Sequence, residues 1–157
     1  MCIRDRIEGV YEGETLNTPS MFCVADALDS LMWIKKIGGL TETIRRSNEN
    51  FKCLQSWVDK TPWIENLVSD PRNRSNTSVC LKFSDERLIS LIPDEKTRFV
   101  KEFVALLEAE NAAFDIKGHR NAPPGLRIWC GATINLDDIQ KLLPWLEYCF
   151  HEIISSY

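Results

Sequence analysis

The C-terminal segment constrains the fold of this 157-residue chain most strongly. Apolar residues recur there at spacings of three and four, which is typical of an amphipathic helix. Asn135 precedes the pattern as a capping residue, and Asp137 and Asp138 in the first turn complement the helix dipole. The apolar positions are Leu136, Ile139, Leu142, Leu143, Leu146, Phe150 and Ile153. A helix with such a face has to bury it against other elements of the chain.

Three more helices and three strands are predicted upstream. Thr18 as cap and Pro19 at the first helical position predict a helix that ends at Gly38-Gly39. A second helix follows to Thr61-Pro62, with an apolar side formed by Leu40, Ile44, Phe51, Leu54 and Val58. A third helix begins at Pro93. Strands are predicted over residues 75–83, 113–116 and 126–133, with a Gly- and Pro-rich loop over residues 117–125.

This order predicts an α/β protein of the α+β kind, with helices packed on one face of a small, mostly antiparallel sheet. The length is sufficient for one core. A formal net charge of −4 disfavours a general nucleic-acid binder. The sequence has neither an apolar run long enough to cross a membrane nor a secretory leader, so we expect a cytoplasmic protein.

The six cysteines predict neither a zinc site nor a redox pair, because no two of them form a C-x-x-C motif. Cys53, Cys80 and Cys149 lie in apolar stretches, where a reduced cysteine acts as a small hydrophobe. His151 on the last helix has no partner in its motif and is interpreted as a surface or packing residue. No serine-hydrolase, P-loop or zinc-protease motif is present.

One segment is a candidate anion site. Residues 116–136 contain no acidic residue, yet they include Lys117, His119, Arg120 and Arg127. Arginine suits carboxylate or phosphate, and a neighbouring histidine adds a donor. The alternative is that these cations only pair with carboxylates elsewhere or face solvent.

A second candidate is the helix start around Asn17 and Thr18, because the N–H groups of a helix N-terminus bind phosphate. The alternative is simple capping. On the residues alone, the chain has two candidate anion sites and no complete catalytic constellation.

Three ordered motifs resemble phosphoserine aminotransferase, a class V, fold-type-I enzyme dependent on pyridoxal phosphate. They are G-E-T-L-N-T-P-S at residues 13–20, R-S-N-T-S-V at 74–79 and G-H-R-N-A-P-P-G-L-R-I-W at 118–129. The resemblance implies that the chain is the C-terminal part of a cytoplasmic homodimer. That enzyme converts O-phosphoserine and 2-oxoglutarate to 3-phosphooxypyruvate and glutamate in serine biosynthesis, and in many bacteria it also serves vitamin B6 synthesis.

The resemblance also assigns roles. Asn17 and Thr18 correspond to the pair that contacts the cofactor phosphate of the other subunit. His119 and Arg120 correspond to residues that hold the substrate phosphate, and Arg127 to the residue that clamps the α-carboxylate. Fixing both ends of the substrate orients its Cα–H bond for reaction. The Schiff-base lysine of the family has no counterpart here, so no catalytic residue is assigned and the chain alone is expected to be inactive.

The implied organisation has three parts: residues 1–8 as a non-native or unstructured leader, 9–60 as the end of the large cofactor domain with connecting helices, and 61–157 as the small domain. Two alternatives remain open. One is a non-enzymatic module that binds a phosphorylated metabolite or a partner protein. The other is a class V aminotransferase with a different substrate, which would have no use for a phosphate clamp at His119 and Arg120.

Overall fold

The computed structural model describes residues 12–13, 20–119 and 121–157. Two compact units divide the chain between Leu40 and Thr41. The division expected at residues 60 and 61 concerns the parts of a larger enzyme and stays a prediction. Within the described residues, no helix is both long enough and apolar enough to cross a membrane.

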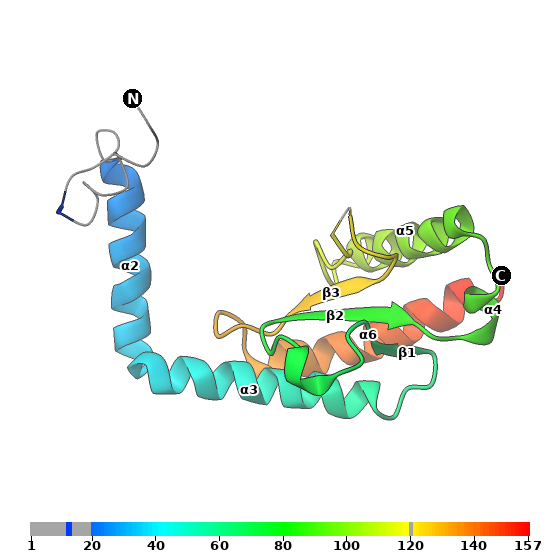
Figure 1. Cartoon of the computed structure of the whole chain (residues 1–157), viewed down its shortest axis with the longest axis horizontal. Coiled ribbons are helices and arrows are strands. Elements are labelled where there is room, and N and C mark those ends of the chain that lie inside the picture. Colours follow the sequence, from blue (N-terminus) through cyan, green and yellow to red (C-terminus); the bar gives the residue numbers. More distant parts are fainter. Residues whose placement is uncertain (1–11, 14–19, 120) are drawn as a thin grey trace. The chain divides into compact units, whose positions relative to one another are not determined.

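Helix α2, Met21–Ile37, makes up most of the described part of the first unit (Figure 1). Its N-cap is Ser20, whose Oγ accepts a hydrogen bond from the Cys23 N–H. The N-cap of α2 is thus Ser20 and not the predicted Thr18, which lies outside the described residues. The expected apolar side is present, but none of the helix is buried. Val24, Leu28, Leu31 and Met32 are all exposed.

Gly38 ends α2 as predicted. Its φ of 121° belongs to a backbone region that glycine adopts readily, and its N–H caps the carbonyls of Ile34 and Lys35. Helix α3, Gly39–Val58, starts at the next residue. Only its second half reaches the core: Leu54 and Val58 are buried, whereas Ile44 is half exposed.

Three antiparallel strands form the sheet in the order β1-β2-β3. They are β1 Ile64–Asn66, β2 Ser78–Phe83 and β3 Leu126–Trp129. The register pairs Val79 with Ile128 and Leu81 with Leu126, and these four side chains are buried on one face. The opposite face carries alternate residues that are partly or fully exposed, including Cys80 and Arg127, which are paired across the ladder.

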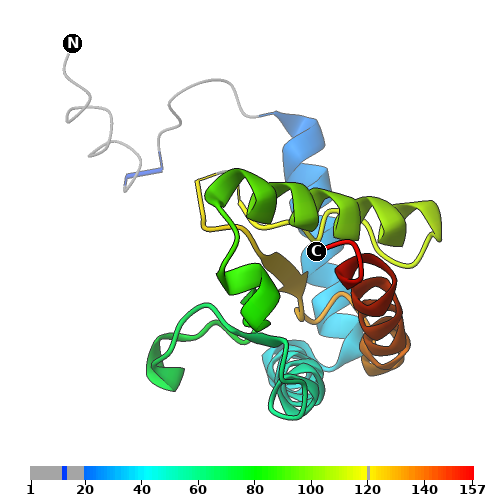
Figure 2. The same ribbon diagram turned by 90° about the vertical axis from the view of Figure 1, so that its right-hand side faces the viewer.

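Helices cover the buried face and complete one core. Helices α5, Pro93–Ala109, and α6, Leu136–Ile154, lie side by side (Figure 2). Aromatic rings join the layers: Trp63 stacks on Phe150 of α6 at a centroid distance of 4.0 Å and on Phe83 of β2 at 6.1 Å. Helix α4, Glu86–Ile89, and the 3-10 turn η1, Pro71–Asn73, connect these elements. The predicted fold class is confirmed.

Two predicted strands are shorter than expected. Residues 75–77 form a turn in which Ser75 Oγ accepts from the N–H groups of Thr77 and Ser78. β3 ends at Trp129, because the chain then turns at residues 130–134. Strand β1 was not predicted, since three residues carry too little periodicity.

The predicted strand at 113–116 is wrong. Residues 113–116 form no strand: Asp115 has a φ of 53° and the preceding Asn111 a φ of 55°, both in the left-handed region, which is outside the range of regular β-strands. The ladder is replaced by a single bridge between Lys117 and Leu126.

Candidate functional site

The loop over residues 117–125 is closed at its base by backbone hydrogen bonds. Gly118 N–H donates to the Gly125 carbonyl at 2.9 Å, and Arg127 N–H donates to the Ile116 carbonyl at 2.7 Å. Gly125 lies against β2, and a Cβ there would be 2.2 Å from the Leu81 carbonyl oxygen. Only glycine permits this approach, so Gly125 anchors the loop to the sheet.

His119 is exposed and oriented by its own turn. The Ala122 N–H donates to its carbonyl at 2.8 Å, and the Asn121 N–H donates to its Nδ1 at 3.2 Å. In the neutral ring, an accepting Nδ1 leaves the proton on Nε2. His119 therefore presents a donor away from its own loop.

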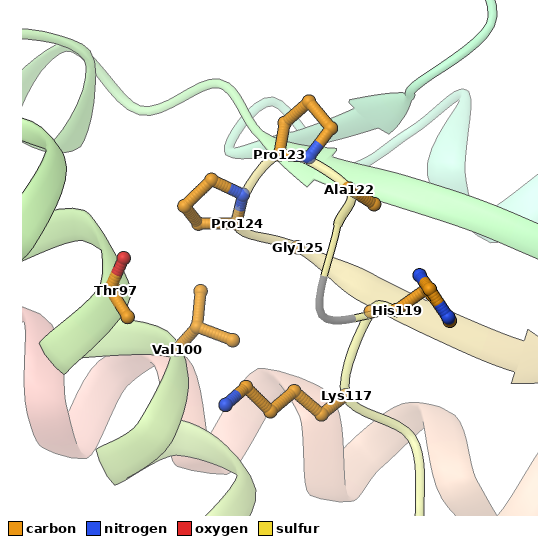
Figure 3. A pocket seen from close by; sticks show the side chains of 9 residues that line it. Thr97, Val100, Lys117, His119, Ala122, Pro123, Pro124 and Gly125 are labelled. Atoms are coloured by element: carbon orange, nitrogen blue, oxygen red, sulfur yellow. The ribbon is translucent and has the colours of Figure 1, made fainter.

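A hollow of about 190 Å³ lies between this loop and α5. Lys117, His119 and Thr97 contribute to its wall (Figure 3). The Lys117 side chain extends toward α5, whereas the His119 imidazole points away from it. Among the described residues, no carboxylate forms an ion pair with Lys117 or His119, so the local charge is positive.

Arg127 lies on the exposed face of β3 and lines a second hollow, of about 400 Å³. Its Nη2 contacts the Asp115 Oδ2 at 3.4 Å. The Arg127 side chain is 38% exposed and the Asp115 side chain 91% exposed, so water reaches the pair. The rest of the lining is Ser78, Phe114, Ile116 and Trp129.

Trp129 shares the exposed face with Arg127, two positions along β3. Its Nε1 donates to Thr133 Oγ1 at 2.9 Å. Its ring covers Gly131 so closely that a Cβ there would lie 2.2 Å from the indole Cζ2. The indole is therefore a fixed wall of the second hollow.

The predicted site residues thus divide into three groups. His119 lines the first hollow, and Arg127, which follows on the same loop and strand, lines the second. Arg120, Asn17 and Thr18 lie outside the described residues. Sequence reasoning missed Asp115 and Trp129. The alternation of β3 could have indicated Trp129, because residues two apart in a strand share a face.

The remaining candidates are structural. His151 is exposed on α6, near Glu147, as interpreted from the sequence. Burial raises the pKa of the Cys130 thiol to about 12 and that of Cys149 to about 11, so both stay protonated. Cys80 was expected in the core, but it is half-buried on the sheet face that carries Arg127.

In the described part of the chain, no group of three potential ligands is gathered around a metal position.

Comparisons with known proteins first define a class. The fold matches a domain of solved aminotransferases. The phosphoserine aminotransferase of Bacillus circulans subsp. alkalophilus aligns with 91% of this chain at a TM-score of 0.72 and 23% identity. The phosphoserine aminotransferase of Trichomonas vaginalis, solved with pyridoxal phosphate bound, aligns with 88% at 0.70 and 22%. No family model matches the chain.

Sequence relatives then name the family to which the chain is similar. The phosphoserine aminotransferases of Methanosarcina mazei and Methanosarcina barkeri are each 42% identical over 90% of this chain. The chain covers 35% and 36% of their respective lengths, and 36% of each of the two solved chains. It is homologous to a C-terminal portion of phosphoserine aminotransferases, which confirms the resemblance identified from the motifs.

Proposed function

We propose that this chain forms the substrate-anion-binding part of a phosphoserine aminotransferase. The reaction is the reversible transfer of an amino group between O-phospho-L-serine and 2-oxoglutarate, with 3-phosphooxypyruvate and glutamate as the other pair. In this proposal the enzyme is a cytoplasmic homodimer that acts in serine biosynthesis. In bacteria that use the enzyme for vitamin B6 synthesis, it acts there as well.

The observation that carries the proposal is the position of Arg127. Its guanidinium lies on a partly exposed sheet face, in a hollow, within the acid-free segment 116–136, and its carboxylate partner Asp115 is itself exposed. A planar guanidinium binds a carboxylate through two parallel hydrogen bonds, which fixes both its position and its orientation. This geometry supports the role that the resemblance implies for Arg127, the binding of the substrate α-carboxylate.

The phosphate end of the substrate is assigned to His119 and Arg120. The Nε2–H of His119 is a suitable donor to a phosphate oxygen, because Nδ1 is engaged by its own loop. Lys117 in the same hollow adds positive charge. Holding phosphate and carboxylate at separate points restricts the rotation of the substrate, and such orientation lowers the barrier for breaking the Cα–H bond.

Asn17 and Thr18 are assigned to the phosphate of pyridoxal phosphate. They precede α2, whose first turn contains no acidic residue, so this helix end is electrostatically suited to an anion. The bound cofactor would supply the electron sink that lets the amino group leave one substrate and join the other. The resemblance places the lysine that holds the cofactor in a segment upstream of the motif at residues 13–20.

A chimaera tests the proposal. Residues 9–157 would replace the homologous portion of the Methanosarcina mazei relative, and kcat/KM for O-phospho-L-serine would be measured with and without Arg127→Ala. Loss of a charge-assisted, bidentate contact costs about 1.5–3 kcal/mol, so kcat/KM should fall about 10- to 150-fold.

Arg72→Ala is the matched control, because Arg72 is also an exposed arginine paired with an aspartate, but on the 3-10 turn. Its kcat/KM should stay within about twofold of the parent. Equal values for Arg127→Ala and Arg72→Ala would refute the role given to Arg127.

A further inference from the structure

The ion pair between Asp115 and Arg127 is weaker than the strongest pair that a carboxylate and a guanidinium can form. A single contact joins Nη2 to Oδ2 at 3.4 Å, whereas charge-assisted hydrogen bonds of this type are usually about 2.7–2.9 Å long. The guanidinium fork offers five N–H donors in one plane. In the described residues, Asp115 is the only carboxylate paired with it, so most of its donors remain free for another acceptor.

The backbone holds Asp115 beside Arg127. The Arg127 N–H donates to the carbonyl of Ile116, the neighbour of Asp115, at 2.7 Å. Asp115 itself has a φ of 53°, a left-handed conformation that aspartate adopts more easily than most residues. The backbone thus keeps Asp115 within reach of the guanidinium, while its exposed carboxylate is not bonded tightly to it.

Solvent exposure makes the contact easy to exchange. The Asp115 side chain is 91% exposed, so its carboxylate regains full hydration when it leaves Arg127. An incoming carboxylate gains two hydrogen bonds in place of one long contact. Exchange is therefore favourable for the ligand and costs little at Asp115.

We propose that Asp115 is a built-in stand-in for the substrate carboxylate. Its own carboxylate pairs with Arg127 in the absence of substrate and is displaced when the substrate carboxylate binds. Asp115 is a positioning residue: it acts through Arg127 and takes no part in the chemistry. This inference rests on the proposed function, since it takes Arg127 as the carboxylate clamp. It adds a competing carboxylate that weakens substrate binding while it keeps the guanidinium in the hollow.

Competition by Asp115 and support by Asp115 predict opposite changes in the affinity for a carboxylate. If Asp115 competes, removal of its charge strengthens the binding of a carboxylate. If Asp115 instead supports Arg127 in a conformation that the ligand needs, the same change weakens binding. Asn at this position keeps the left-handed backbone and the shape of the side chain, so Asp115→Asn changes charge and little else.

The test titrates the 157-residue chain with 2-oxoglutarate, a ligand with carboxylates and no phosphate, and follows the Arg127 side-chain Nε–H signal by NMR. Asp115→Asn should lower the dissociation constant about two- to fivefold, the scale of a surface ion pair. The matched control is Asp137→Asn, an exposed aspartate paired with Lys141 on α6. Its dissociation constant should equal that of the parent chain.

Each outcome separates the inference from the proposed function. Unchanged or weaker binding by Asp115→Asn, or no binding by either chain, overturns the stand-in role. Arg127→Gln supplies the second arm. Binding lost in Arg127→Gln but not improved in Asp115→Asn overturns the stand-in role alone. Binding kept in Arg127→Gln contradicts the clamp itself, and with it the proposed function.

Discussion

Asn50 is a single residue on which the turn after β3 depends. Its side chain is 1% exposed, and Nδ2 donates to the carbonyls of Cys130, Gly131 and Ile134 at 3.2–3.3 Å. Asn50→Ala removes this donor from all three carbonyls, of which that of Gly131 keeps the Ile134 N–H as a partner, so the free energy of unfolding should fall by about 1–3 kcal/mol in urea titration. Asn48→Ala removes an exposed side chain that accepts a hydrogen bond from Asn76, and it should change the free energy of unfolding by less than about 0.5 kcal/mol. Equal effects would contradict the role of Asn50.

Gly131 determines where the Trp129 indole lies. Any Cβ at residue 131 overlaps the ring, so Gly131→Ala must displace the indole and break its hydrogen bond to Thr133. We expect the Trp129 Nε1–H signal in an NMR spectrum to shift strongly in Gly131→Ala. Gly39→Ala is a contrast for the ring contact, because a Cβ there meets no atom within 4 Å and the strain from its φ of 74° falls on the start of α3. An unshifted Trp129 signal would show that the position of the indole does not depend on Gly131.

At the scale of elements, helices α2 and α5 differ in what their apolar residues do. Leu107 of α5 is fully buried, whereas Leu31 of α2 is exposed. Leu107→Ala should therefore lower the free energy of unfolding of the second unit by about 2–5 kcal/mol. Leu31→Ala should leave it unchanged, as measured by urea titration of tryptophan fluorescence. A large loss in Leu31→Ala would mean that this side of α2 is covered.

Long periodic elements were predictable from the sequence, and short ones were not. Residues 136–154 form a helix because its apolar face, its Asn135 cap and its acidic first turn all agree. The strand expected at 113–116 fails because left-handed residues at 111 and 115 are imposed by the loop, and propensity does not reveal them. Arg127 was found because arginine in an acid-free segment is visible in the sequence. Its pairing with Asp115 was not, since it depends on how loop and strand meet.

At the scale of the whole molecule, exposed ion pairs should make stability depend on pH in acid. Hydrogen bonds from Arg45 and then from Arg46 lower the pKa of Glu42 from 4.5 to about 2. A lowered pKa in the folded state means that the contribution of Glu42 is complete above pH 4.5 and is lost as the pH falls toward 2. Stability of the parent chain should therefore decrease between pH 5 and pH 2, and Glu42→Gln should show a smaller decrease. Identical pH profiles would contradict the assignment.

The central claim is that the chain contributes the site that recognises a phosphorylated amino acid. The most direct measurement compares kcat/KM for O-phospho-L-serine and L-serine in the chimaera with the Methanosarcina mazei relative. The two substrates share the carboxylate and differ in the phosphate that His119 and Arg120 are assigned to hold. We expect transamination of O-phospho-L-serine and a preference for it that His119→Ala reduces. A folded, cofactor-loaded chimaera that does not prefer O-phospho-L-serine would contradict the account.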